Sequence, residues 1–135
     1  MQTFLPYPSF TSSAAVLDRQ RLGKQRVEAK QILNALRNGG GWSNHPAVRM
    51  WRGHEHALAL YGASMCVVWR QRGYKDSLLP FFLSVAADTP DTGLPAWWGD
   101  DALHASHRSN LLRKDPAHYG QMWGGPDDLP YVWPV

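Results

Sequence analysis

Residues 18–33 read Asp18-Arg-Gln-Arg-Leu-Gly-Lys-Gln-Arg-Val-Glu-Ala-Lys-Gln-Ile-Leu33, and this stretch decides the fold. Its apolar positions recur on one stripe at a helical pitch of about 100° per residue, which predicts an amphipathic helix that continues to about Arg37. The stripe consists of Leu22, Ala29, Ile32, Leu33 and Leu36. A glycine run at residues 39–41 predicts the end of the helix. We expect the stripe to face a hydrophobic core.

The charged residues of this helix fall on its two flanks. One flank carries Arg19, Arg26, Lys30 and Arg37. The other carries Arg21, Lys24 and Glu28. A single carboxylate is therefore expected among cations, at the edge of a buried face. The alternative is a solvated surface in which Lys24 and Glu28 form an ion pair, worth roughly 0.2–0.5 kcal/mol.

Length and composition limit the class of protein. The 135 residues suffice for one domain, residues 1–135, with its own core. No apolar run is long enough to span a membrane, and no secretory signal is recognisable at the N-terminus. The single cysteine, Cys66, excludes an intrachain disulfide, so we expect a cytoplasmic protein. The net charge of +3 is weak evidence for a nucleic-acid partner.

Two further long helices are expected, and no alternating pattern indicates a strand. The first starts at Pro46 and runs to Arg72, with a core stripe of Trp51, His54, Leu58, Tyr61, Met65 and Val68. His54 is interpreted as a hydrogen-bonded core histidine. The second runs over residues 102–114 and is capped by Asp100 or Asp101. Residues 77–87 fit either a short helix or buried irregular chain.

Both ends of the chain are expected to be irregular. Residues 1–10 are apolar and contain prolines at positions 6 and 8, which predicts an extended arm laid on the body. Residues 124–135 are rich in proline, glycine and aromatics, which predicts a tail packed against the body. The sequence therefore predicts an all-α, compact single domain of three main helices.

Two common catalytic motifs are absent. There is no phosphate-binding glycine loop and no nucleophile elbow. The histidines lack the companions of a metal site, and Cys66 is interpreted as a core residue. Basic helices interleaved with aromatics favour nucleic-acid binding instead. On the helix over residues 102–114, His104, Arg108, Asn110 and Arg113 are candidates to hold a phosphate or sugar, although a solvated surface is the alternative.

Three segments, in this order, resemble the pyrimidine-dimer DNA glycosylase family of the phage endonuclease V type. The first is Leu22-Gly-Lys-Gln-Arg-Val-Glu28, with the family's spacing from leucine to glutamate. The second is the helix that begins at His45-Pro46 and ends in Trp69-Arg-Gln-Arg-Gly-Tyr74. The third is the basic segment over residues 106–120, with a proline and a His118-Tyr119 pair. Together they cover about two thirds of the chain.

The resemblance implies a fold, a reaction and a partner. It implies one compact helical domain that binds duplex DNA with a damaged or modified pyrimidine, removes the base and then breaks the strand at the abasic (AP) sugar. An N-terminal α-amine would attack the sugar and form a Schiff base, assisted by one glutamate. No cofactor, metal, membrane or obligate protein partner is implied.

The resemblance also assigns residues. By position the catalytic groups would be the Met1 amine and Glu28. The DNA-binding residues would be Arg19, Arg21, Lys24, Arg26, Lys30, His104, Arg108, His118 and Tyr119.

Two departures concern the chemistry. The family's nucleophile becomes free when the first methionine is removed, but Gln2 is too large for ordinary removal, so the Met1 amine itself would act. Lys24 is the alternative nucleophile. The family also has an arginine directly before its glutamate, where this chain has Val27, which the helical pitch directs away from the core.

Two other functions remain open at this point. One is a non-catalytic protein that binds distorted nucleic acid through the same basic surface. The other is an enzyme that cleaves the N-glycosidic bond of a free nucleoside or nucleotide.

Overall fold

Seven helices and no strand make up the computed structural model, which describes residues 1–135 and confirms the predicted all-α class. The three long helices are α2 (Arg19–Asn38), α4 (Glu55–Gln71) and α6 (Asp101–Lys114). The shorter ones are α1 (Phe10–Val16), α3 (Pro46–Arg49), α5 (Leu79–Asp88) and α7 (Pro116–Tyr119). None of them combines the length and the apolar composition that crossing a lipid bilayer requires.

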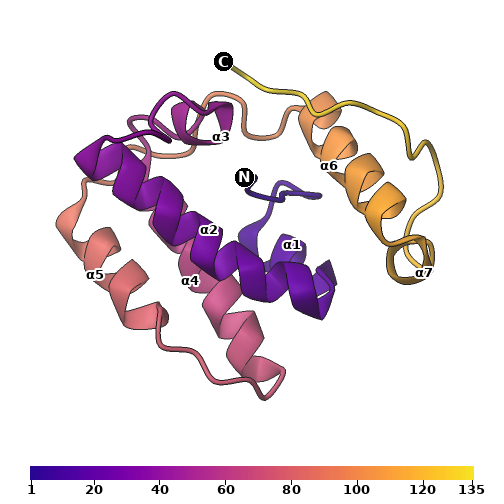
Figure 1. The fold of residues 1–135 in the computed structure, drawn as a ribbon, viewed down its shortest axis with the longest axis horizontal. Coiled ribbons are helices and arrows are strands. Elements are labelled where there is room, and N and C mark those ends of the chain that lie inside the picture. Colours follow the sequence, from indigo (N-terminus) through magenta and orange to yellow (C-terminus); the bar gives the residue numbers. More distant parts are fainter.

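Helix α2 follows the sequence pattern closely. The Asp18 carboxylate accepts a hydrogen bond from the Arg21 N–H and caps the first turn. Gly39, with φ of 75°, ends the helix in a conformation that favours glycine. Four of the five predicted core residues are fully buried and Leu36 is partly buried, while Val27 points to solvent. Figure 1 shows α2 lying across α4, with α5 beside them.

The predicted helix over residues 46–72 is wrong in one respect, because the chain breaks between α3 and α4. Gly53 adopts a φ of 85°, which interrupts the helical path. His54 therefore precedes α4 instead of joining its core stripe. Its Nδ1 lies 3.1 Å from the Gly93 carbonyl oxygen and 3.2 Å from the Thr92 hydroxyl, so it holds the loop before α6.

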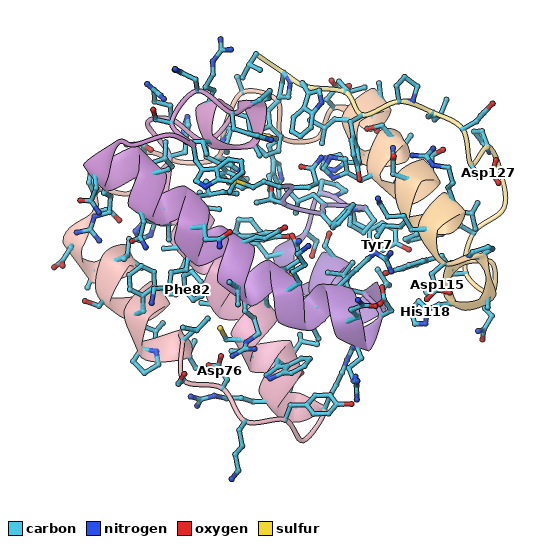
Figure 2. The ribbon with its side chains drawn as sticks, in the orientation of Figure 1. Tyr7, Asp76, Phe82, Asp115, His118 and Asp127 are labelled. Atoms are coloured by element: carbon cyan, nitrogen blue, oxygen red, sulfur yellow. The ribbon has the colours of Figure 1, made fainter.

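A buried carboxylate joins α2, α4 and α5. Asp76 lies in the segment before α5, its side chain is fully buried, and it pairs with the Arg26 guanidinium of α2 (Figure 2). Arg70 of α4 lies 3.5 Å away. Although burial opposes its ionisation, the hydrogen bonds from Arg26 and from the start of α5 hold the pKa of Asp76 below its ordinary value. Of the two structures that the sequence allowed for residues 77–87, the short helix is the one observed, as α5.

Helix α6 carries a polar face that is buried under the C-terminal tail. The Asp100 carboxylate caps the helix, as one of the two predicted candidates. The Ser109 hydroxyl and the Asn110 amide bond to the backbone N–H and carbonyl of Leu129. Arg113 donates to the Asp127 carbonyl. These side chains hold the irregular tail, which explains why the helix is polar without being solvated.

The N-terminal arm is inside the molecule. Figure 1 shows the N-terminus between α2 and α6, and residues 2–5 are between 0 and 6% exposed. The prediction of an arm laid on the surface of the body is therefore wrong, because residues 2–5 are part of the core. The arm can enter the core because side chains satisfy its backbone: the Phe4 N–H donates to Gln25 Oε1 at 2.9 Å, and the Leu5 N–H donates to His107 Nδ1 at 2.9 Å.

His107 accepts that bond only as a neutral imidazole. Burial, with a smaller contribution from His104, lowers the pKa of His107 from 6.5 to about 3. Between these two values the unfolded chain binds a proton that the folded chain does not. His107 therefore takes nothing from the free energy of unfolding above about pH 6.5, and it lowers that free energy as the pH drops towards 3.

We predict that acidification destabilises the wild type more than His107→Gln. Between about pH 7 and pH 5 this histidine should remove about 2 kcal/mol from the free energy of unfolding, and the variant should lack that loss. Urea denaturation of both proteins at the two pH values measures the difference. Equal losses in the two proteins would mean that His107 is not held neutral.

We also predict that Gln25→Leu lowers the free energy of unfolding by about 1–3 kcal/mol, because the buried Phe4 N–H then lacks an acceptor. The matched control is Gln20→Leu, since Gln20 lies on the same helix, is exposed, and its side chain makes no hydrogen bond within the protein. Denaturation of the two variants should differ by at least 1 kcal/mol by that estimate; similar values would contradict the proposed anchoring.

Candidate active site

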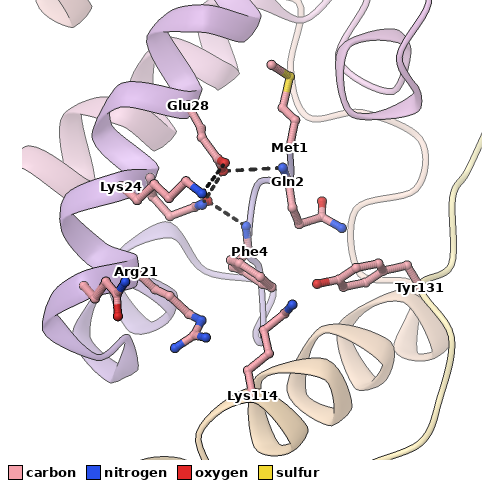
Figure 3. Close-up of a pocket in the computed structure, with 10 residues that line it drawn as sticks. Met1, Gln2, Phe4, Arg21, Lys24, Glu28, Lys114 and Tyr131 are labelled. Carbon is pink, nitrogen blue, oxygen red and sulfur yellow. Dashed lines mark hydrogen bonds and ion pairs between the residues drawn. The ribbon is translucent and has the colours of Figure 1, made fainter.

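A pocket of about 290 Å³ opens where the arm, α2, the end of α6 and the tail meet (Figure 3). The arm contributes its first residues, α2 contributes five polar side chains between residues 20 and 28, and two residues come from the C-terminal third. Ten residues line it: Met1, Gln2, Phe4, Gln20, Arg21, Lys24, Gln25, Glu28, Lys114 and Tyr131.

Glu28 is the only carboxylate in the pocket lining. Its side chain is 12% exposed. The Gln25 amide donates to Glu28 Oε2 at 2.9 Å, and Lys24 Nζ lies 3.8 Å from Oε1. Because these residues precede Glu28 by three and four positions, the helix itself places them beside it. The carboxylate is thereby oriented and stays accessible from the pocket.

The arm brings the N-terminus to this carboxylate. The Gln2 backbone N–H points at Glu28 Oε2 from 3.4 Å, so the α-amine of Met1 is only one residue away from that contact. His45 lies in the same neighbourhood. Its pKa is lowered by burial and then by the positive charge of the N-terminal ammonium, while Glu28 opposes this shift. An amine, a carboxylate and an imidazole thus share one region.

The pocket is strongly positive. The Met1 ammonium, Arg21, Lys24 and Lys114 face the single charge of Glu28. Arg21 also pairs with Asp18, at 3.3 Å, which fixes its position at the start of α2. Such a lining attracts an anion, and it suits a sugar–phosphate chain better than a neutral metabolite.

Four of the residues assigned by sequence meet in this pocket: Met1, Arg21, Lys24 and Glu28. Arg19 lies in an adjoining groove that shares Lys24 with the pocket, with its guanidinium 5.9 Å from the centre of the Tyr74 ring. Lys30 points elsewhere, 5.1 Å from the centre of the Phe81 ring on α5. Arg26 is bound to the buried Asp76, so its charge is already neutralised.

The expected DNA contacts of α6 and α7 need correction. His104 is 2% exposed, and its two ring nitrogens bond to the Leu5 carbonyl and the Gly99 N–H. Tyr119 is fully buried and donates to the Asp18 carboxylate. Arg108 donates to the Pro6 carbonyl at 2.6 Å. Their polar atoms face protein backbone and side chains, because the buried arm and α2 need partners there.

His118 follows the same pattern, since its Nε2 lies 2.9 Å from the Val16 carbonyl oxygen. Figure 2 shows His118 and Asp115 beside the start of α2. The basic and aromatic residues of this region therefore hold α1, α2 and the arm together.

Sequence reasoning missed several lining residues. Gln25 could have been found, because it lies three positions before Glu28 on the same helix. Lys114 and Tyr131 gave no local signal, since only the folded chain brings them to Glu28. Gln2 was considered only for its effect on the N-terminal amine and not as part of the lining.

The rest of the chain offers no reactive thiol and no metal-binding cluster. Cys66 is buried as predicted, and burial together with the neighbouring Asp76 raises the pKa of its thiol to about 12, so it is a poor nucleophile. No group of three or more histidine, cysteine, aspartate or glutamate side chains is arranged to hold a metal ion.

Comparison with known proteins gives one result. No curated protein and no solved structure matches the chain. The family model described as pyrimidine dimer DNA glycosylase matches residues 1–79, which is more than half of the chain. The match includes the arm, α1 to α4 and Glu28, whereas α6, α7 and the tail lie outside it. The chain belongs to the pyrimidine dimer DNA glycosylase family.

Proposed function

We propose that residues 1–135 act as one domain, a DNA glycosylase with AP lyase activity on damaged pyrimidines in duplex DNA. The observation that carries this proposal is the contact between the Gln2 N–H and Glu28. It brings the α-amine of Met1 close to a mostly buried carboxylate. An amine can act as a Schiff-base nucleophile, and a carboxylate beside it can move the protons of the reaction. The family supports DNA as the substrate.

In the first step the Met1 ammonium loses a proton to water, and the resulting neutral amine attacks the C1′ atom of the target sugar. A bond forms between the amine nitrogen and C1′, the N-glycosidic bond breaks, and the base leaves with its electron pair and takes up a proton. Positive charge develops on the sugar, and the Glu28 carboxylate stabilises it. The bond between C1′ and O4′ then breaks, its electron pair goes to O4′, which takes up a proton, and the amine nitrogen forms the C1′=N double bond of the Schiff base.

In the second step Glu28 removes a proton from C2′. The electron pair forms a double bond between C2′ and C3′, and the bond from C3′ to oxygen breaks, which releases a 5′-phosphorylated strand. Water then hydrolyses the Schiff base and frees the amine. Gln25 and Lys24 hold the Glu28 carboxylate in one orientation. It can therefore stabilise the positive charge in the first step and accept the proton in the second.

DNA binding would use the positive charges around the pocket. Arg21 and Lys24 line it, and Arg19 extends the charge into the adjoining groove. We propose that these three residues bind phosphates of the duplex near the target, other than the one that leaves during strand cleavage. The target nucleotide or its partner must leave the base stack for an amine to reach C1′.

The test is borohydride trapping on a duplex with one abasic site, followed by intact-mass measurement. The wild type should form a covalent adduct, and Glu28→Gln should slow strand cleavage by about 100-fold or more while retaining salt-dependent binding. Glu55→Gln is the matched control, because Glu55 is the chain's only other glutamate and lies outside the pocket.

Each other outcome identifies an alternative. Salt-dependent binding with no adduct and no product would indicate a non-catalytic protein that recognises distorted nucleic acid. Weak binding to duplex together with release of a base from free nucleosides would indicate a small-molecule enzyme. A duplex carrying a pyrimidine dimer, tested in parallel, decides whether the dimer itself is a substrate.

A further inference from the structure

Three side chains from separate segments form a wall of the pocket opposite Glu28. Gln2 comes from the arm, Lys114 from the last turn of α6, and Tyr131 from the tail. Figure 3 shows the Lys114 side chain extending from α6 into the pocket and the Tyr131 hydroxyl directed into the same space. Lys114 and Tyr131 lie outside the part of the chain that the family model matches.

These side chains carry hydrogen-bond donors that the protein leaves unused. Gln2 is 5% exposed, and its Nε2 has no partner, whereas its Oε1 accepts the Thr3 N–H at 2.9 Å. That bond fixes the orientation of the amide. A buried unpaired N–H group destabilises a fold, so a ligand that accepts a hydrogen bond from it would offset this cost.

Lys114 and Tyr131 add a charge and a hydroxyl. Neither side chain makes a hydrogen bond or an ion pair within the protein, and the Tyr131 ring packs against Phe4 and Trp133. Burial raises the pKa of the Tyr131 hydroxyl and outweighs the opposing effect of Arg113 and Arg21, so this group keeps its proton. The wall thus presents an amide N–H, an ammonium and a hydroxyl.

We propose that Gln2, Lys114 and Tyr131 bind the phosphate on the 3′ side of the target nucleotide, the one that leaves during strand cleavage. This inference rests on the proposed function. Several donors with one positive charge match an anion with several acceptor oxygens. In a DNA strand that group is a phosphate.

The position opposite Glu28 supports the choice of this phosphate. Glu28 takes the proton from C2′, and the neighbouring C3′ carries the leaving oxygen. When the C3′–O bond breaks, its electron pair goes to that oxygen, and the phosphodiester with one negative charge becomes a monoester that approaches two. The phosphate must avoid the carboxylate, and Lys114 would stabilise the added charge.

The experiment compares Lys114→Met with Lys75→Met, an equally simple change at an exposed lysine outside the pocket. Single-turnover strand cleavage of an abasic duplex and borohydride trapping are measured in parallel. Lys114→Met should slow cleavage by about 10- to 100-fold, while the rate of trapping changes by less than about threefold. Lys114→Arg should restore most of the cleavage rate, because it restores the charge.

A second readout does not need catalysis. Binding to a duplex with a tetrahydrofuran abasic analogue is measured against salt, and Lys114→Met should reduce the slope of log K against log salt by about 0.9. Tyr131→Phe should weaken this binding and leave the slope unchanged, because it removes a donor without a charge.

The outcomes separate the two proposals. If the wild type forms an adduct but Lys114→Met cleaves at the wild-type rate with an unchanged salt slope, the phosphate site is wrong and the lyase stands. If the wild type forms no adduct, the lyase fails, and the salt slope alone decides whether Lys114 binds a phosphate.

Discussion

The structure depends on the burial of the first residues of the chain. An extended arm has no internal hydrogen bonds, so it can enter a core only where side chains pair with its backbone. Gln25 of α2 and His107 of α6 accept from consecutive N–H groups, and the Tyr61 hydroxyl of α4 donates to the Phe4 carbonyl at 3.0 Å. The three long helices are thus joined through the arm, and their arrangement determines where the N-terminus lies.

The same pairing explains the composition of α6. A helix with histidines, serines, an asparagine and arginines resembles a solvated or DNA-facing surface, yet here it lies between two irregular segments. One side of it satisfies the arm through His104, His107 and Arg108, and another satisfies the tail through Ser109 and Asn110. The helix needs polar residues because both of its neighbours are irregular segments whose backbone groups require hydrogen-bond partners. Lys114, at the end of the helix, faces the pocket instead.

Local patterns predicted the core stripe of α2, its end at the glycine run and the placement of Glu28 beside Lys24, because these relations depend on local sequence alone. The break at Gly53 was missed, since a stripe of apolar residues continues across it. The buried arm, the burial of His104 and Tyr119, and the approach of Lys114 and Tyr131 to Glu28 depend on contacts between distant segments, for which a single sequence carries no periodic signal. The charge of Arg26 was misassigned because its partner, Asp76, is fifty positions away.

The measurement that tests the central claim most directly is tryptic mapping of the borohydride-trapped protein by tandem mass spectrometry. The N-terminal tryptic peptide, Met1–Arg19, contains no lysine, so an adduct on it can lie only on the α-amine. We predict that the sugar remnant is found on this peptide. An adduct on Lys24 or Lys114 instead would contradict the claim that the buried arm exists to bring the α-amine to Glu28.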